Sequence, residues 1–248
     1  MRGLRPPRPT CLPAVPSEAS PATPTQLAAT ILAAGMGLRL GSRPKAALEI
    51  DGVSLLQRHS QALAGVGATP VRVVIGPYAD TLLSLARQAH IQPLVHTLAA
   101  PSLIDSQRLA VRAHLADPQL AACDLMLLVA DLPELNASHL APLMQAWHQR
   151  PDGVHALVPT VEGRRGHPVI LSLHALRAIS AQADHLGVRD WMTHHRQAVQ
   201  VYSTPHRAHV TDLDTQEDLV MLQTRLAPQH VAWPVGLAGA GASHPGTP

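Results

Sequence analysis

Short apolar runs alternate along the chain with segments in which apolar residues recur at helical spacing. The apolar runs predict strands, because a strand that is covered on both faces needs apolar side chains throughout. Apolar positions three or four residues apart predict helices. The predicted strands cover residues 27–32, 71–76, 91–96, 125–130, 156–161 and 168–172, and the predicted helices cover residues 54–66, 80–89, 102–115, 138–149, 173–181, 188–195 and 215–226.

This alternation predicts an α/β protein with a mostly parallel, Rossmann-like sheet between two layers of helices, a three-layer αβα sandwich. The run from Leu125 to Ala130 is continuously apolar and is therefore expected at the centre of the sheet. Ligands of such sheets bind beyond the carboxyl ends of the strands. Functional residues are accordingly expected directly after the predicted strands.

The regular alternation is confined to the middle of the chain. Residues 27–227 have the length of one ordinary domain, which we expect them to form. Residues 1–26 are rich in Pro, Ser, Thr and Ala, a composition that predicts a disordered tail. Residues 228–248 have a similar composition and are expected to form a flexible C-terminal tail.

Composition excludes several function classes. The formal net charge is +2, and the chain has no Phe, two Tyr and three Trp, so neither a basic stripe nor a base-stacking platform for nucleic acid is expected. Two cysteines far apart give neither a disulfide framework nor a zinc site. No apolar stretch reaches the roughly 18 residues that span a bilayer, and the N-terminus lacks the apolar region of a signal peptide. We therefore expect a cytoplasmic protein without a membrane partner.

The most informative segment is the glycine-rich turn that follows the first predicted strand, within the sequence ILAAGMGLRLGSRPK. Gly35 and Gly37 allow backbone N–H groups to approach an anion closely. Arg39, Arg43 and Lys45 then supply cations, of which Arg binds phosphate oxygens as a planar fork and Lys as a point charge. The segment indicates a polyphosphate site, and an ordinary turn with solvated cations is the alternative.

This turn matches neither of the two common nucleotide motifs. A P-loop, G-x-x-x-x-G-K-[ST], requires a glycine five residues after Gly35, where the chain has Leu40. The dinucleotide fingerprint G-x-G-x-x-G requires its third glycine at the same position. A different nucleotide-binding arrangement is therefore expected.

An acidic residue, Asp131, directly follows the central apolar strand. Magnesium in proteins prefers one or two carboxylates together with phosphate oxygens of the substrate. Asp131 is therefore a candidate magnesium ligand beside the polyphosphate site. The structural alternative is that Asp131 caps the segment that begins at Pro133.

A second acidic segment, TDLDTQEDL, precedes the last predicted helix. Thr215 can cap this helix, with Asp218 three residues later as its partner. Capping does not account for Asp212 and Asp214, which lie in extended chain and point to the same side. Either one is a candidate for the second metal ligand, and a loop of solvated acids is the alternative.

A polar loop, Gly163-Arg164-Arg165-Gly166-His167, enters the strand predicted at residues 168–172. Arg164 or Arg165 can receive an anionic acceptor, because guanidinium groups pair with phosphate oxygens. His167 can add a hydrogen bond to the same acceptor. A surface turn without a ligand is the alternative.

The segments LAAGMGLRLGSRPK, VADLP, RRGHPVIL and TDLDTQEDL occur in this order. With them, residues 27–226 resemble the MobA-like nucleotidyltransferase family, and most closely its molybdenum cofactor cytidylyltransferases. The resemblance implies the fold of the nucleotide-diphospho-sugar transferases. The glycine turn alone is shared with many nucleotidyltransferases, whereas the segments around His167 and Asp214 favour the cofactor branch.

The resemblance also implies roles for particular residues. The backbone from Leu32 to Gly35 would hold the base and ribose of the nucleotide, and Arg39 and Lys45 would clamp the triphosphate as the catalytic cations. Asp131 and Asp212 would hold Mg²⁺. The implied nucleotide-binding residues are Leu32, Ala33, Ala34, Gly35, Gly37, Arg39, Lys45 and Ser106, and Arg165 and His167 would bind the acceptor.

The activity implied is transfer of CMP from CTP to a phosphorylated acceptor, molybdopterin, with release of pyrophosphate. A molybdoenzyme or its insertion chaperone is the implied protein partner. Two alternatives stand beside this hypothesis. The segment Arg43–Leu48 looks more like sugar-phosphate nucleotidyltransferases, and Asp105, near the expected nucleotide base, motivates a non-catalytic nucleotide- or cofactor-binding module.

Overall fold

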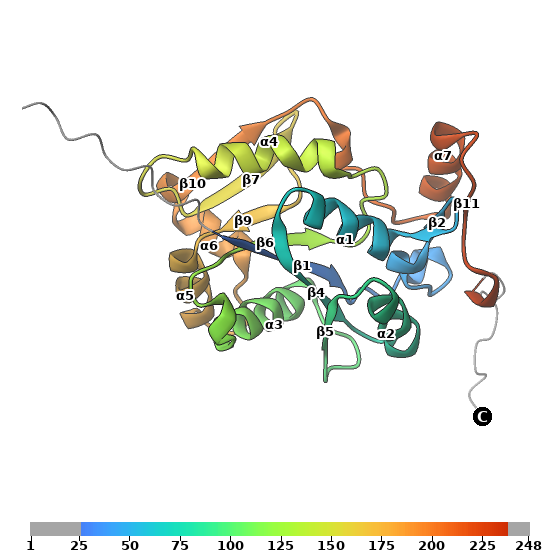
Figure 1. Cartoon of the computed structure of the whole chain (residues 1–248), viewed down its shortest axis with the longest axis horizontal. Coiled ribbons are helices and arrows are strands. Elements are labelled where there is room, and N and C mark those ends of the chain that lie inside the picture. Colours follow the sequence, from blue (N-terminus) through green and yellow to red (C-terminus); the bar gives the residue numbers. More distant parts are fainter. Residues whose placement is uncertain (1–25, 238–248) are drawn as a thin grey trace, which may run out of the picture.

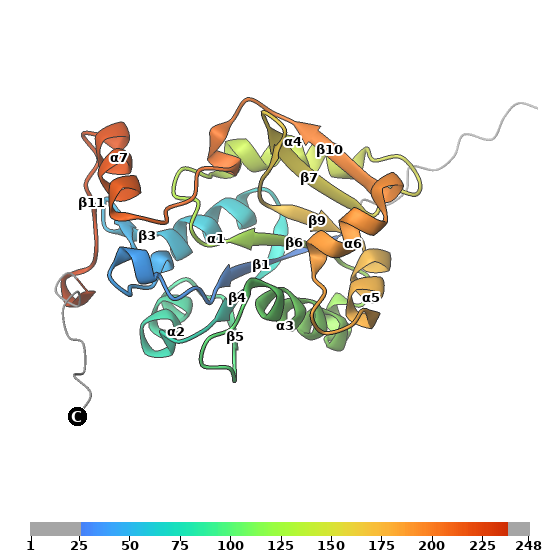
Figure 2. The same cartoon turned by 180° about the vertical axis from the view of Figure 1, so that it is seen from behind.

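The computed structural model describes residues 26–237, which form a central sheet with helices on both faces (Figures 1 and 2). The predicted three-layer α/β architecture is thereby confirmed. The strands of the central sheet run in the order β10-β7-β9-β6-β1-β4-β5, with β8 paired to β7. They are β1 (Leu27–Ala33), β4 (Ala68–Ile75), β5 (Gln92–Val95), β6 (Asp124–Val129), β7 (Ala156–Val161), β8 (Arg164–Arg165), β9 (Val169–Leu171) and β10 (Val199–Ser203).

The strands that position the candidate site are parallel. β1 pairs in parallel with β4 and with β6, so that Leu32 lies opposite Val129 and Ala33 lies opposite Ile75. The chain therefore leaves all three strands at the same edge of the sheet. The antiparallel pairs lie to one side of this group, where β9 runs against β6 and β7, and β8 runs against β7.

Helices cover both faces of the central sheet. They are α1 (Leu55–Gly65), α2 (Ala79–Gln88), α3 (Leu103–Ala116), α4 (Ala137–His148), α5 (Leu173–Ala181) and α6 (Val188–His194). A further helix, α7 (Gln216–Leu226), lies beside a small second sheet. Most of these bounds lie within one or two residues of the predicted ones, because each helix begins near the cap or apolar residue expected from sequence.

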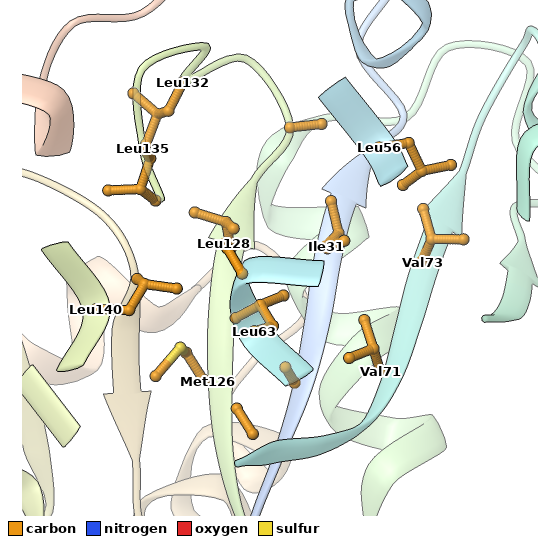
Figure 3. Packing of buried hydrophobic residues seen from close by; sticks show 14 of the residues in the cluster. Ile31, Leu56, Leu63, Val71, Val73, Met126, Leu128, Leu132, Leu135 and Leu140 are labelled. Atoms are coloured by element: carbon orange, nitrogen blue, oxygen red, sulfur yellow. The ribbon is translucent and has the colours of Figure 1, made fainter. Parts of the chain in front are cut away.

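The buried side chains of β1 alternate between two cores, as the pleat of a strand requires. Ile31 packs in the core that α1, α2 and α4 share, where it lies near Leu56 and Leu63 of α1 (Figure 3). Leu32 belongs to the opposite core, with α3, α5 and α6. Burial on both faces explains why this strand is apolar at every position except Thr30.

A buried carboxylate, Asp124, pairs with several polar groups beside the first core. Trp147 of α4 is fully buried, and its indole N–H donates a hydrogen bond to Asp124 of β6 at 3.1 Å. Asp124 also accepts hydrogen bonds from Arg150 at 3.1 Å and from the backbone N–H of Leu173 at 3.0 Å. One carboxylate thus connects β6 with the end of α4 and the start of α5.

The prediction of a flexible tail from residue 228 onward is wrong for residues 228–237. Within this segment, β11 (Val231–Ala232) pairs antiparallel with β2 (Glu49–Ile50), which in turn pairs with β3 (Val53–Ser54). Val231 is buried beside Ile50 in a core that α7 shares. A two-residue strand gives no periodic pattern, and its partner lies about 180 positions away in the sequence, which explains the error. Residues 238–248 and the tail predicted over residues 1–26, except Gln26, lie outside the described residues.

Two further features of the described part of the chain bear on the sequence predictions. β10 was not predicted, because its residues are only half-buried and lack a continuous apolar run. No helix within residues 26–237 has the length and apolar character that crossing a bilayer requires.

Replacing Trp147 should test the core around Asp124. We expect Trp147→Ala to lower the free energy of unfolding by about 3–5 kcal/mol, because it leaves a cavity and removes a donor from a buried carboxylate. Trp233→Ala is the matched control, since Trp233 is only partly buried, and it should cost clearly less. Urea unfolding measures both variants, and equal losses would contradict the assignment of Trp147 to the core.

Candidate active site

The turn after β1 folds back on itself because Gly37 adopts a left-handed conformation with φ of 57°. A Cβ at this position would overlap the backbone carbonyl of Arg43, so only glycine fits there without strain. The carbonyl of Gly37 accepts backbone hydrogen bonds from Leu40 at 2.9 Å and from Ser42 at 3.0 Å. The turn therefore returns the chain toward β1 and delivers the segment that carries Lys45.

Lys45 lies at the centre of the candidate site, between two carboxylates. Its Nζ donates a hydrogen bond to Oδ2 of Asp131 at 2.9 Å and a very short one to Oδ1 of Asp214. Arg39 forms a salt bridge with the other oxygen of Asp214 at 2.7 Å. The structure thus joins the glycine turn, the turn after β6 and the segment before α7, as the sequence predicted for Arg39, Lys45 and Asp131.

The charges of this cluster stabilise one another. Burial alone would lower the pKa of Lys45, but attraction to Asp131 and hydrogen bonds to both carboxylates raise it above its ordinary value. The hydrogen bond from Lys45 lowers the pKa of Asp214, and its burial only partly opposes this shift. Lys45 therefore stays protonated and Asp214 stays ionised near neutral pH.

Of the two acids left open as the second metal ligand, the structure places Asp214 rather than Asp212 on Lys45 beside Asp131. The side chain of Asp212 is 44% exposed and pairs with Arg164 at 3.3 Å. The difference arises from tertiary contacts: the backbone N–H of Leu213, between the two acids, donates to the carbonyl of Asp131 at 2.9 Å. This contact fixes which carboxylate reaches Lys45.

The capping box of α7 holds Asp214 in place, as the sequence predicted for Thr215 and Asp218. The hydroxyl of Thr215 accepts a hydrogen bond from the backbone N–H of Asp218 at 3.2 Å. The carboxylate of Asp218 in turn accepts backbone hydrogen bonds from Thr215 at 2.8 Å and from Asp214 at 3.0 Å. Asp218 is therefore a residue that orients the site through the backbone of Asp214.

A small cavity of about 150 Å³ opens beside Lys45, at the carboxyl ends of β1 and β6 and the start of α3. A Cβ at Gly35 would meet nothing within 4 Å, so the absence of a side chain there leaves open space. Among the predicted nucleotide-binding residues, Gly37 and Arg39 lie outside this cavity. Its lining contains Leu32, Ala33, Ala34, Gly35, Lys45, Ala46, Pro101, Ser102, Leu103, Ser106, Val129, Ala130 and Asp131.

The N-terminus of α3 explains why an acidic residue, Asp105, lies near the expected position of the nucleotide base. Ser102 is the N-cap of α3, and the carboxylate of Asp105 accepts hydrogen bonds from its backbone N–H at 2.8 Å and its hydroxyl at 2.6 Å. These bonds lower the pKa of Asp105. Ser106, which is buried, donates its hydroxyl to the carbonyl of Ser102 at 3.0 Å. Asp105 therefore stabilises the helix that forms one wall of the small cavity.

A larger cavity of about 710 Å³ adjoins the small one, since Leu103 lines both. The predicted acceptor residues Arg165 and His167 line it together with Arg164. Burial lowers the pKa of His167, and its hydrogen bond with the carbonyl of Leu127 opposes this only in part, so the imidazole is neutral near pH 7. The sequence analysis missed Gln107, Arg189 and Thr193, which α3 and α6 bring into the lining from positions without any motif.

The arrangement suits a ligand that carries several phosphates. The carboxylates of Asp131 and Asp214 converge on one cationic atom, the Nζ of Lys45, and this lysine lines the small cavity. Two such carboxylates fit a divalent cation that takes its remaining ligands from phosphate oxygens and water. No group of three or more His, Cys, Asp or Glu residues gathers as a metal site within residues 26–237, so an ion held by protein side chains alone is not indicated.

Comparison with known proteins gives one family and one curated relative. The family described as "MobA-like NTP transferase domain" matches residues 29–199. The "Bifunctional protein GlmU" of Azorhizobium caulinodans is 34% identical over 146 residues, which is 56% of this chain. The match covers 31% of that relative, so the chain spans less than a third of its length.

Solved structures share the fold. Rv0371c from Mycobacterium tuberculosis H37Rv superposes with a TM-score of 0.64 at 20% identity, over 80% of this chain and 98% of that one. Another structure of Rv0371c is a complex with manganese, with a TM-score of 0.59. A cytidylyltransferase from Leptospira borgpetersenii also has a TM-score of 0.59, at 17% identity, over 81% of this chain and 86% of that one.

Neutralising one carboxylate at a time should separate Asp214 from Asp212. We expect Asp214→Asn to lower the pKa of Lys45, because it removes a charge that favours the ammonium form. Asp212→Asn is the matched control and should leave the pKa of Lys45 unchanged, since Asp212 pairs with Arg164 instead. NMR titration of the Lys45 side chain measures both, and the reverse outcome would restore Asp212 as the second carboxylate.

Proposed function

Because the chain belongs to the MobA-like NTP transferase family, we propose that it transfers a nucleoside monophosphate from a nucleoside triphosphate to a phosphorylated small molecule. The observation that carries this proposal is the position of Lys45. Its ammonium group lies between two carboxylates at the edge of the small cavity, which adjoins the larger, arginine-lined one. One cavity is thereby suited to the nucleotide and the other to the acceptor.

In the proposed reaction, a phosphate oxygen of the acceptor attacks the α-phosphorus of the triphosphate. The bond between that phosphorus and the bridging oxygen to the β-phosphate breaks, and pyrophosphate leaves in line with the attack. Arg39 and Lys45 stabilise the negative charge on the α-phosphate and the leaving group. No general base is required, since a phosphate monoester is already largely ionised at neutral pH. The protein acts mainly by positioning two anions that would otherwise repel each other.

Asp131 and Asp214 are the residues that would hold a divalent cation, and we assign it as Mg²⁺. Both carboxylates bind the same ammonium group and so already share one positive charge. The manganese complex of Rv0371c supports a divalent metal in a protein of this fold. When bound, such an ion offsets the charge of the phosphate oxygens.

The size of the small cavity supports a pyrimidine nucleotide, and we propose CTP. A cavity of about 150 Å³ is known to accept a single six-membered ring, and this one has about the same volume. Ala34 at its wall is similar to cytidylyl enzymes, whereas guanylyl enzymes usually carry glycine there. The cytidylyltransferase from Leptospira borgpetersenii, which shares the fold, is in line with this choice.

We propose molybdopterin as the acceptor, on the basis of the segments RRGHPVIL and TDLDTQEDL, and with it a molybdoenzyme or its insertion chaperone as partner. A sugar phosphate is the second candidate, favoured by the segment Arg43–Leu48. A panel of candidate acceptors, assayed by pyrophosphate release, distinguishes the two.

The alternative hypothesis of a non-catalytic binding module was motivated by Asp105. The structure accounts for Asp105 as part of the capping box of α3, so this motivation is removed. Tight nucleotide binding without pyrophosphate release from any acceptor would favour the module instead.

Removing the central charges should abolish turnover while the fold persists. We expect Lys45→Ala to lower turnover by about 10²–10³, the usual effect of losing one preorganised charge at the reacting group. Asp131→Ala should abolish magnesium-dependent pyrophosphate release and weaken Mn²⁺ binding, which electron paramagnetic resonance measures without turnover. Asp212→Ala is the matched control for the metal and should keep Mn²⁺ affinity. Pyrophosphate release from Asp131→Ala at the wild-type rate would reject the metal assignment.

Gly35→Ala should narrow the small cavity without unfolding the protein. Its backbone is not left-handed and a Cβ there meets no neighbour, so we expect the urea midpoint to stay near that of the wild type. Nucleotide affinity should fall, because the methyl group occupies space at the cavity wall. Gly37→Ala is the contrasting variant and should lower the urea midpoint.

Calorimetric titration of the wild type with CTP, UTP, ATP and GTP tests the proposed preference for a pyrimidine nucleotide. Equal affinities for all four nucleotides would refute it.

A further inference from the structure

A third cavity, of about 730 Å³, lies on the side of α1 and α4, and we call it the rear cavity. Its walls come from α1, the turn after β6, the start of α4, the end of α7 and a 3₁₀ turn at Arg207–His209 (Figures 1 and 2 locate the helices). It shares no lining residue with the two cavities of the candidate active site. Its lining consists of Arg58, Pro133, Glu134, Asn136, His139, His206, Arg207, Ala208, Thr211, Arg225, Leu226 and Gln229.

The rear cavity has an excess of positive charge. Three arginines line it, against a single carboxylate, Glu134, which already forms a salt bridge with Arg225 at 2.8 Å. Arg58 and Arg207 make no side-chain hydrogen bond or salt bridge to any residue from 26 to 237, although Asp51, outside the lining, attracts Arg58 from a distance. The three arginines and one glutamate therefore give the lining a formal charge of +2, which equals the formal net charge of the whole chain.

One of these arginines has a donor that needs a partner. The Nε of Arg58 is buried and has no hydrogen-bond partner in the described part of the chain. A buried N–H without an acceptor is costly, and a guanidinium N–H gains most from an anionic oxygen. Because this Nε has no accessible surface, an anion in the rear cavity would reach the guanidinium of Arg58 through its other N–H groups, for which the hydrogen bonds and salt bridges within residues 26–237 give no partner.

Two histidines add polar groups to the same wall. Nδ1 of His139 accepts a hydrogen bond from the backbone N–H of Asn136 at 3.3 Å, so the proton of the neutral ring sits on Nε2 and can be donated. The ring of His206 packs edge-on against His139, with 5.2 Å between the centroids. Both rings lie at the start of α4, where the helix dipole also favours negative charge.

We propose that the rear cavity binds the phosphate or diphosphate group of a small molecule, at a site distinct from the candidate active site. Guanidinium groups from α1, the 3₁₀ turn and α7 surround a space of the size that small-molecule ligands usually occupy, about 300–1,000 Å³. The lining gathers cations from three separate segments around one space, which suits a compact phosphate group better than an extended polymer. The ligand is therefore a phosphorylated metabolite or inorganic pyrophosphate, and the shared chemistry is the phosphate.

Calorimetric titration of inorganic pyrophosphate in the presence of EDTA tests this proposal, because it needs neither turnover nor a divalent ion. The wild type should bind two pyrophosphates, one at each site. The double variant Arg58→Gln/Arg207→Gln should lose one of them, with affinity there falling about tenfold or more as two charge-assisted contacts are removed. The control Arg87→Gln/Arg177→Gln removes the same charge from exposed positions elsewhere and should keep both.

The site can also be located directly. Crystals soaked in selenate should show an anomalous scatterer within hydrogen-bond distance of Arg58 and Arg207. If the double variant fails to fold, the single variant Arg207→Gln, at an exposed position, replaces it. Equal binding of pyrophosphate by the wild type and Arg58→Gln/Arg207→Gln would overturn the proposal, whether one or two pyrophosphates bind to the wild type. This result does not bear on nucleotidyl transfer, which is tested separately through Lys45 and Asp131.

Discussion

The candidate active site depends on one electrostatic constraint, the ammonium group of Lys45 between the carboxylates of Asp131 and Asp214. Two carboxylates that converge on one point would repel each other without a cation between them. The lysine resolves that repulsion and joins three segments that are remote in sequence. Two local features support this contact. Gly37 reverses the chain so that Lys45 lies near the end of β1, and Asp218 holds the backbone of Asp214 before α7.

The parallel sheet supplies the position at which these segments meet. β1 and β6 run side by side and end at the same edge, so the turns that follow them are neighbours whatever their sequence separation. The small cavity lies at this edge, and the larger one lies where the antiparallel strands β8 and β9 extend the sheet. Lys45 lines the small cavity and Arg164 and Arg165 line the larger one, so a ligand that spans both cavities would meet positive charge at each end.

Sequence patterns predicted most structural features that local interactions determine, and they missed the features that depend on tertiary contacts. The glycine turn, Asp131 and the capping box at Thr215 follow from strand ends, φ preferences and capping rules, and the structure has all three. The choice of Asp214 over Asp212 depends on a hydrogen bond from Leu213 to the turn after β6, which no spacing rule contains. β11 depends likewise on a partner strand far away in sequence. Asp105 is the exception, because Ser102 and Asp105 form a capping box with the same spacing as Thr215 and Asp218, a local signal that the sequence does contain.

The histidines show why the proposed chemistry relies on lysine, arginine and carboxylate side chains. Sixteen histidines are many for this chain, and any of them in the cavities would be an obvious base. The structure instead gives the buried ones low pKa values: burial brings the pKa of His59 to about 4, and burial also lowers the pKa of His167 and His209. Such imidazoles are neutral at pH 7, where they donate or accept hydrogen bonds without adding charge. The proposed reaction between a phosphate monoester and a triphosphate needs charge compensation rather than proton removal, and the charged side chains that could supply it are gathered around Lys45.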